Sequence, residues 1–89
     1  MKIEFDPAKR RRTLEERGLD FADAGIVFDG PNITYDDLRW DYAERRLITI
    51  GRLRGRLVLV AWTPRGDACR VISMRKANAR EEALYGGRV

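Results

Sequence analysis

The 89-residue sequence contains no histidine, the side chain that most often carries protons at neutral pH. Its absence excludes Ser–His and Cys–His nucleophile pairs and most zinc chemistry. An enzyme built on this chain must therefore transfer protons through carboxylates, tyrosines or other groups.

Cysteine is nearly absent as well, because Cys69 is the only one. A single cysteine excludes an internal disulfide and a thiolate cluster for a structural metal, and it fits a reducing, cytoplasmic compartment. Cys69 lies in an apolar strand pattern and has no histidine to activate it, so we expect a buried, inert thiol. We expect neither a metal site nor a cofactor.

Long hydrophobic runs are also missing. No stretch approaches the length of a membrane-spanning helix, and the N-terminal residues MKIEFDPAKR lack the apolar core of a signal peptide. The sequence thus predicts a cytoplasmic protein with no membrane partner.

Positive charge, in contrast, is abundant. Eighteen Lys and Arg residues outnumber 14 Asp and Glu residues, giving a net charge of +4 and a pI near 9.7. Much of the excess is arginine, whose planar guanidinium suits phosphate, so nucleic acid is the natural partner class, although a basic surface can also serve solubility alone. The length and the 44% hydrophobic content predict one compact domain over residues 1–89.

The first part of the chain predicts an edge strand followed by a helix. Lys2–Phe5 alternates between polar and apolar residues, as a strand at a sheet edge does. Asp6 can cap a helix that has Pro7 in its first position, and Gly18 can end that helix. We therefore expect a helix over Pro7–Arg17.

A second helix is predicted directly afterwards. Asp20 can cap it, and apolar residues recur at helical spacing from Phe21 to Phe28, which indicates a core-facing side. The segment Asp29–Asn32 breaks the helix. Ile33–Tyr35 then has the composition of a short edge strand, and Asp36–Glu44 reads as a loop.

The second half of the chain predicts an antiparallel meander and a final helix. Its strands are Arg46–Ile50, Arg56–Trp62 and Cys69–Met74, joined by turns at Gly51–Gly55 and Thr63–Ala68.

The final helix, Ala79–Tyr85, begins with Asn78 and Glu81 in capping-box spacing. Together these elements predict an α+β fold, in which two N-terminal helices and a C-terminal helix pack on an antiparallel β-sheet.

Several segments, taken in order, resemble one known family. They are IEFDPAK, GLDFADA followed by VFDGP, the strand end Ile50-Gly51, the hairpin VAWTPRGD, and RVISMRKA followed by Glu81 and Tyr85. Together they resemble the BrnT family of toxins. The resemblance implies a RelE-like ribonuclease fold and a toxin of a type II toxin–antitoxin system that cleaves RNA. It also implies a BrnA-type antitoxin in a toxin–antitoxin heterotetramer, with operator DNA contacted only through the antitoxin.

The sequence departs from the family pattern at three places. Phe5 stands where the family often has Trp, and Thr13 lies near a family Asn. Glu16, Arg17 and Gly18 replace the family's Lys-His-Gly. A guanidinium does not titrate near neutral pH, so Arg17 could bind a phosphate but could not act as an acid or base.

An RNA-cleaving enzyme can use the substrate's own 2′-OH as nucleophile, so it must mainly position the phosphate and stabilise the charge that develops on it. Arginines meet this need. We expect Arg75 at a strand end, Arg46 at the start of a strand and Arg65 in a turn to be catalytic.

Weaker candidates complete the predicted site. Glu81 and Tyr85 lie four residues apart on one helix face and could act as base and acid; alternatively, Tyr85 packs on the sheet while Glu81 caps the helix and pairs with an arginine. The predicted substrate-binding residues are Lys9, Arg17, Lys76 and Arg80.

A second function class fits the same residues. Because the family His is missing at Arg17, the chain could be a catalytically degenerate RNA- or protein-binding module on the same scaffold. Such a module would bind RNA or antitoxin without forming product. Tyr35, Trp40 and Trp62 could stack bases, although Trp62 alternates with Val58 and Val60 as a core residue does.

Overall fold

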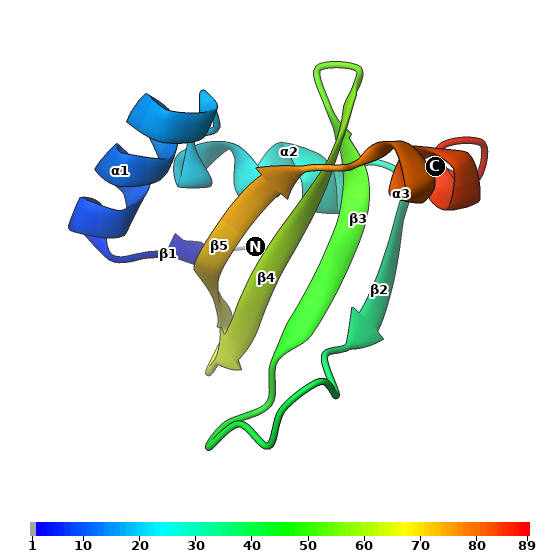
Figure 1. The fold of residues 1–89 in the computed structure, drawn as a ribbon. Helices are drawn as coiled ribbons and strands as arrows, with labels where there is room; N and C mark the ends of the chain where they lie inside the picture. The colour runs from blue at the N-terminus through cyan, green and yellow to red at the C-terminus, as the bar shows by residue number, and fades with distance from the viewer. Residues whose placement is uncertain (1) are drawn as a thin grey trace.

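A single five-stranded sheet with helices on both sides organises the computed structural model, which describes residues 2–89 (Figure 1). The elements in chain order are β1 (Lys2–Glu4), α1 (Pro7–Arg17), the short 3-10 helix η1 (Phe21–Asp23), α2 (Ala24–Asp29), β2 (Asn32–Asp36), β3 (Leu47–Leu53), β4 (Arg56–Arg65), β5 (Ala68–Lys76) and α3 (Ala79–Tyr85). The mixed α+β fold is confirmed.

The strand order is β1-β5-β4-β3-β2, and β2 to β5 pair antiparallel as predicted. The predicted fully antiparallel sheet is wrong at one edge, because β1 pairs parallel with β5, aligning Lys2 with Ala68 and Glu4 with Arg70. Strands joined by short turns must run antiparallel, but β1 and β5 are separated by most of the chain. The direction of β1 therefore depends on tertiary packing, which local sequence does not encode.

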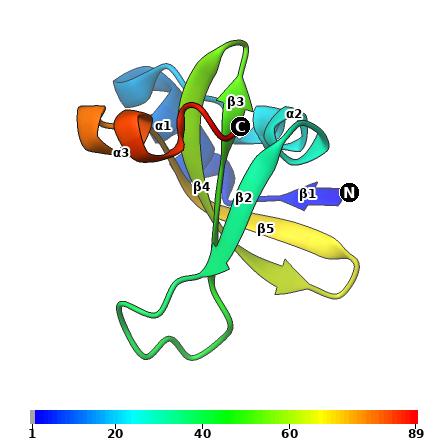
Figure 2. The same cartoon turned by 90° about the vertical axis from the view of Figure 1, so that its right-hand side faces the viewer.

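The sheet separates two apolar clusters, because neighbouring residues of a strand point to opposite faces. On one face, Val58 and Val60 of β4 pack with Phe21 and Val27 beneath α2. On the other face, which carries α3, the cluster consists of Ile48, Ile50, Leu57, Leu59, Ala61 and Ala77. Figure 2 shows α2 and α3 on opposite sides of the sheet.

The first helix begins and ends as predicted. The Asp6 side chain accepts a hydrogen bond from the Ala8 N–H at 3.0 Å, and Pro7 occupies the first helical position. Gly18 has φ +69°, the left-handed conformation that ends a helix. No residue of α1 is buried, and the helix lies beside β5 (Figure 1).

The second helix differs slightly from its prediction. Asp20 caps it as expected and accepts a hydrogen bond from the Ala22 N–H at 2.9 Å. Its first turn is a 3-10 turn, however, and the α-helix begins only at Ala24. Phe21 and Ala24 are buried and Phe28 is half-buried, which confirms the predicted core-facing side.

The strand β3 is longer than predicted, because Gly51 lies within it. The turn to β4 consists only of Arg54 and Gly55, with φ of +48° and +85°, as a tight two-residue hairpin requires. Gly51 serves another purpose. A Cβ placed there would lie 2.9 Å from the Val27 Cγ1 atom, so the missing side chain lets α2 pack closely on β3.

The strand β4 also continues beyond its predicted end at Trp62, and the turn to β5 contains only Gly66 and Asp67. Pro64 lies within β4 and not in the predicted turn Thr63–Ala68, of which a proline is typical. Its pairing partner is Cys69 of β5, whereas the β3 partners of β4 end at Trp62. This part of β4 therefore has a neighbour on one side only, and there a proline is tolerated.

Candidate active site

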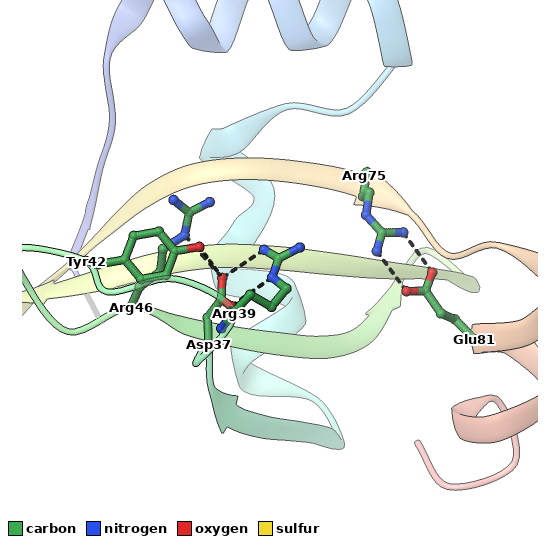
Figure 3. Close-up of polar contacts among 6 residues, drawn as sticks. All are labelled: Asp37, Arg39, Tyr42, Arg46, Arg75 and Glu81. Atoms are coloured by element: carbon green, nitrogen blue, oxygen red, sulfur yellow. Dashed lines mark hydrogen bonds and ion pairs between the residues drawn. The ribbon is translucent and has the colours of Figure 1, made fainter.

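A groove of about 510 Å³ lies on the sheet face that carries α3. Its floor is formed by strands β3, β4 and β5, one wall by β2, one end by α3 and the other by the segment after β2. The lining residues are Tyr35, Asp36, Asp37, Leu38, Arg39, Ile48, Leu59, Ala61, Ser73, Arg75 and Glu81. Figure 3 shows the two polar clusters along this stretch of sheet, one around Asp37 and one formed by Arg75 and Glu81.

Arg75 and Glu81 form a bidentate ion pair. The Arg75 Nη1 and Nη2 atoms each donate to a Glu81 carboxylate oxygen at 2.7 Å (Figure 3). Arg75 faces the groove because it pairs across the sheet with Leu59, a residue of the groove floor. The guanidinium is partly exposed, with 44% of the side chain accessible, whereas Glu81 is 17% accessible. A planar fork held in this way can also bind a phosphate.

The start of α3 holds Glu81 in place. The Asn78 side chain accepts a hydrogen bond from the Glu81 N–H at 2.8 Å, and the Glu81 carboxylate accepts one from the Asn78 N–H at 2.9 Å. This is the predicted capping box. The hydrogen bonds from Arg75, followed by that from Asn78, hold the pKa of Glu81 below its usual value. The hydrogen bonds to Glu81 raise the pKa of Arg75, so both groups are charged at neutral pH.

Tyr35 lines the wall of the groove. It lies on β2 opposite Ile48 and keeps 42% of its surface exposed. Burial raises the pKa of its phenol above the usual value; Tyr85 and Glu81 raise it further, while Arg39 and Arg75 oppose the rise. The phenol is therefore protonated at neutral pH and can donate a hydrogen bond into the groove.

Asp37 organises the loop between β2 and β3. Its buried carboxylate accepts hydrogen bonds from Arg39 Nε and Nη2, both at 2.8 Å, and from the Tyr42 hydroxyl at 3.0 Å (Figure 3). The Arg46 Nε atom lies 3.6 Å from the same carboxylate, and its guanidinium lies over the Tyr42 ring. The bonds from Arg39 above all hold the pKa of Asp37 far below its usual value.

A second, smaller groove of about 210 Å³ lies between α1 and β5. Its lining residues are Lys9, Arg12, Thr13, Glu16, Arg17, Phe21, Ile72 and Ser73. Ser73 also lines the first groove, so the two depressions meet across β5. The Arg17 Nη1 atom donates to the Met74 carbonyl at 2.7 Å, which ties the end of α1 to this strand.

The comparisons with known proteins agree with this architecture. Residues 5–81 match the family described as ribonuclease toxin, BrnT, of type II toxin–antitoxin system. The chain belongs to the BrnT family. Its structure is similar to the crystal structure of the Brucella abortus ribonuclease toxin BrnT, with a TM-score of 0.68 and 34% identity, covering 88% of this chain and 97% of that chain. No curated protein matches the chain.

Membership in the BrnT family confirms the resemblance that the sequence motifs indicated. The family consists of ribonuclease toxins of type II toxin–antitoxin systems, which implies an antitoxin as partner. The groove on the α3 face is therefore the candidate active site of a ribonuclease.

The BrnT groove brings together two of the five residues expected to be catalytic, Arg75 and Glu81. Tyr85 is half-buried and packs against the apolar cluster of this sheet face. The alternative expectation, in which Tyr85 packs on the sheet while Glu81 caps α3 and pairs with an arginine, is what the structure contains.

Arg46 and Arg65 do not line the groove of this BrnT chain. Arg46 precedes β3 instead of starting it, and its guanidinium is directed to Asp37 and Tyr42. Arg65 is the last residue of β4 instead of a turn residue, and its Nη2 atom lies 3.6 Å from the Glu44 Oε1 atom. The β4–β5 turn lies at the end of the sheet opposite α3, so the extra length of β4 carries Arg65 away from Arg75 (Figure 1).

The four residues expected to bind substrate do not lie together in one groove. Lys9 and Arg17 line the second groove. Lys76 and Arg80 are exposed, next to Arg75 and Glu81 in the sequence, and line neither groove.

Three groove residues were not predicted in these roles: Tyr35 as a polar wall residue, and Asp37 and Arg39 as an ion pair. The loop has no hydrophobic periodicity, so its order was not evident. The sequence contained one signal of this order. Two acidic residues, Asp36 and Asp37, stand at the start of the loop, and two basic residues, Arg45 and Arg46, stand at its end. Such a pattern is typical of a loop closed by its own ion pairs.

Residues 2–89 contain neither a candidate metal centre nor a candidate membrane-spanning helix. No group of three or more His, Cys, Asp or Glu side chains there could hold a metal ion. None of the helices in that range is long and apolar enough to cross a membrane.

Proposed function

We propose that residues 1–89 act as one toxin domain that cleaves RNA in the groove on the α3 face, with the fold of RelE-like ribonucleases. The observation that carries this proposal is the position of Arg75. It presents a partly exposed guanidinium from a rigid strand beside a carboxylate and a phenol, above an apolar floor. These groups match the three tasks of RNA cleavage: holding the phosphate, taking a proton and supplying one.

In the proposed reaction, the 2′-OH of a ribose attacks the adjacent phosphorus. The P–O5′ bond breaks, leaving a 2′,3′-cyclic phosphate on one product and a 5′-hydroxyl on the other. Arg75 binds the non-bridging oxygens, where negative charge develops in the transition state. Loss of one such preorganised donor typically lowers the rate by a factor of about 100 to 1,000.

Glu81 is the proposed base for the 2′-OH proton. In the free protein its pKa is lowered chiefly by Arg75, and a low pKa makes a weak base. When the RNA phosphate binds Arg75, the guanidinium divides its hydrogen bonds between the phosphate and Glu81. The pKa of Glu81 then rises, and the carboxylate becomes a stronger base. Substrate binding thus activates the carboxylate at the moment when it is needed.

Tyr35 is the proposed acid for the leaving 5′-oxygen, because its phenol is protonated at neutral pH and lines the groove. Tyr85 was the first candidate for this role. Its packing against the apolar cluster favours a structural role, in which it seats α3, and with it Glu81, on the sheet.

Cationic residues outside the groove are proposed to hold the rest of the RNA. Lys9 and Arg17 line the second groove, which meets the first at Ser73. Lys76 is the last residue of β5, directly after Arg75, and Arg80 lies on α3, directly before Glu81. Arg46 and Arg65 are proposed to act indirectly, by stabilising the loop between β2 and β3. Arg46 lies close to the carboxylate of Asp37, and Arg65 lies close to that of Glu44.

The proposed partner is a BrnA-type antitoxin, in a heterotetramer built on an antitoxin dimer. Operator DNA would be contacted only through the antitoxin. The family membership supports this proposal, since a type II toxin requires an antitoxin.

The direct test is incubation of the purified protein with RNA in the presence of EDTA, beside Arg75→Ala. Because we propose that arginine supplies the charge stabilisation, wild type should cleave without added metal, and Arg75→Ala should be at least about 100-fold slower. Arg54→Ala is the matched control, since Arg54 is also ion-paired but pairs with Asp23 of η1. Absence of cleavage by wild type, or equal rates for both arginine variants, would contradict the proposal.

One observation favours a second function, a binding module without catalysis. Arg17, which stands where the family often has His, donates to the Met74 carbonyl and thus has a structural partner. If catalysis required that His, RNA would bind without being cleaved. A filter-binding measurement beside the cleavage assay separates the two functions.

A further inference from the structure

The loop between β2 and β3 exposes two large apolar side chains, Leu38 and Trp40. They are 86% and 73% accessible, whereas the other exposed large apolar residues of the described chain lie between 42% and 55%. A single exposed leucine is ordinary on a protein surface. A tryptophan and a leucine two residues apart, each more than 70% accessible, indicate a surface that a partner covers.

Hydrogen bonds of side chains and backbone order this loop. Arg39, between the two apolar residues, is fixed to the buried Asp37 by two hydrogen bonds of 2.8 Å. The Asp37 N–H donates to the Arg46 carbonyl at 2.8 Å, which closes the loop. Leu38 and Trp40 are therefore presented before any partner arrives, and a preorganised anchor loses little conformational entropy on binding.

The charges around these side chains favour a protein partner over RNA. Each arginine of the loop, Arg39, Arg45 and Arg46, already lies within 4 Å of a carboxylate. Asp41, beside Trp40, has no ion pair among residues 2–89. A phosphate backbone that passed beside Trp40 would be repelled by the carboxylate of Asp41. An apolar protein surface with a basic side chain at its edge would be complementary.

The position of the loop links this surface to the active site. Leu38 lines the candidate active-site groove, and it also lines a shallow depression together with Trp40 and Asp41. A protein seated on Trp40 and Leu38 would therefore cover the mouth of the groove at the end opposite Glu81.

We propose that Leu38 and Trp40 are the docking anchor for the antitoxin, which presents an apolar surface edged by basic side chains and excludes RNA by covering the groove. The inference rests on the proposed function for the identity of the partner. Tryptophan is enriched among the few residues that contribute most of the binding energy of a protein interface. Trp40 thus serves recognition of the antitoxin, and the groove serves the RNA.

The test uses the full chain and the purified antitoxin encoded beside its gene. Trp40→Ala should weaken antitoxin affinity, measured by calorimetry, by about 30-fold or more, the effect of losing an interface hot spot. Its RNA cleavage rate without antitoxin should equal that of wild type. Leu84→Ala, which removes a 55% exposed leucine of α3, should change neither quantity. Thermal unfolding of Trp40→Ala checks that the fold persists.

Three outcomes would overturn the inference. Unchanged antitoxin affinity in Trp40→Ala would show that the antitoxin binds elsewhere. A fall in RNA affinity with intact antitoxin binding would make Trp40 a base-stacking residue. A change in self-association alone would make the loop a contact between two copies. If wild type cleaves no RNA, the proposed function fails, but the affinity measurement still decides the role of Trp40.

Discussion

At the scale of single residues, the Arg75–Glu81 pair combines two requirements that usually conflict. A phosphate-binding arginine must be rigid, yet its guanidinium must be available to the substrate. Glu81 holds Arg75 through two bonds of 2.7 Å, while 44% of the arginine side chain stays accessible. Exposed ion pairs contribute little stability, so an RNA phosphate can compete for this guanidinium at low cost.

The variant Glu81→Gln separates the two roles of this carboxylate. Loss of its charge frees Arg75 for phosphate, so RNA should bind more tightly, and loss of the base should slow single-turnover cleavage by a factor of about 100 or more. The measurement is the cleavage rate at saturating enzyme together with the RNA dissociation constant. An unchanged rate would show that Glu81 only positions Arg75.

Asp37 is the residue on which the loop depends, because its buried carboxylate bonds Arg39 and Tyr42 and lies near Arg46. Asp37→Asn keeps the shape but removes the charge. At neutral pH we expect a loss of about 2 kcal/mol in the free energy of unfolding, as for hydrogen bonds to a charged group. Urea unfolding of both proteins measures the difference.

The pH dependence of that difference has a defined sign. The pKa of Asp37 is lower in the folded protein than the usual value of about 3.9 in an unfolded chain. The stabilisation is therefore complete above about pH 5 and declines as pH falls below the unfolded pKa. A stability difference between wild type and Asp37→Asn that grows toward acid pH would contradict this assignment.

At the scale of elements, the site depends on how closely α2 packs beneath β3, since β3 forms part of the groove floor. Gly51 permits this contact: an added Cβ would lie 2.9 Å from Val27 Cγ1 and 3.3 Å from the Pro31 carbonyl oxygen. Val27 is fully buried and has little room to move.

Gly51→Ala should therefore destabilise the fold by about 1–3 kcal/mol, the usual effect of overpacking a core. Gly87→Ala is the control, because nothing lies within 4 Å of the added Cβ at that position. Thermal unfolding of the two variants checks the prediction. Equal melting temperatures would mean that α2 can shift away from β3 freely.

At the scale of the whole molecule, the features that could be predicted are those with local causes. The bounds of α1 and α3 follow from Asp6, Gly18 and the Asn78–Glu81 capping box, all of which act within a few residues. The direction of β1 and the lengths of β3 and β4 were not predictable, because they depend on partners far along the chain.

In the candidate site, too, the residues with local causes could be predicted and those that depend on distant strands could not. Arg75 was predictable because it lies near the end of a strand that precedes a capped helix, and its pairing with Glu81 was one of two expected arrangements. Tyr35 enters the groove only because β2 pairs with β3 at the sheet edge. Arg65 was misplaced because pairing with β5 extends β4 through Pro64.

The central claim is that Arg75 stabilises attack by the RNA's own 2′-OH in this groove. Mass spectrometry of the products of one RNA, cleaved in EDTA by wild type and by Arg75→Ala, tests it most directly. We predict 2′,3′-cyclic phosphate and 5′-hydroxyl ends from wild type, and the same ends formed at least about 100-fold more slowly by the variant. Products with 3′-hydroxyl and 5′-phosphate ends, or equal rates for the two proteins, would contradict the account.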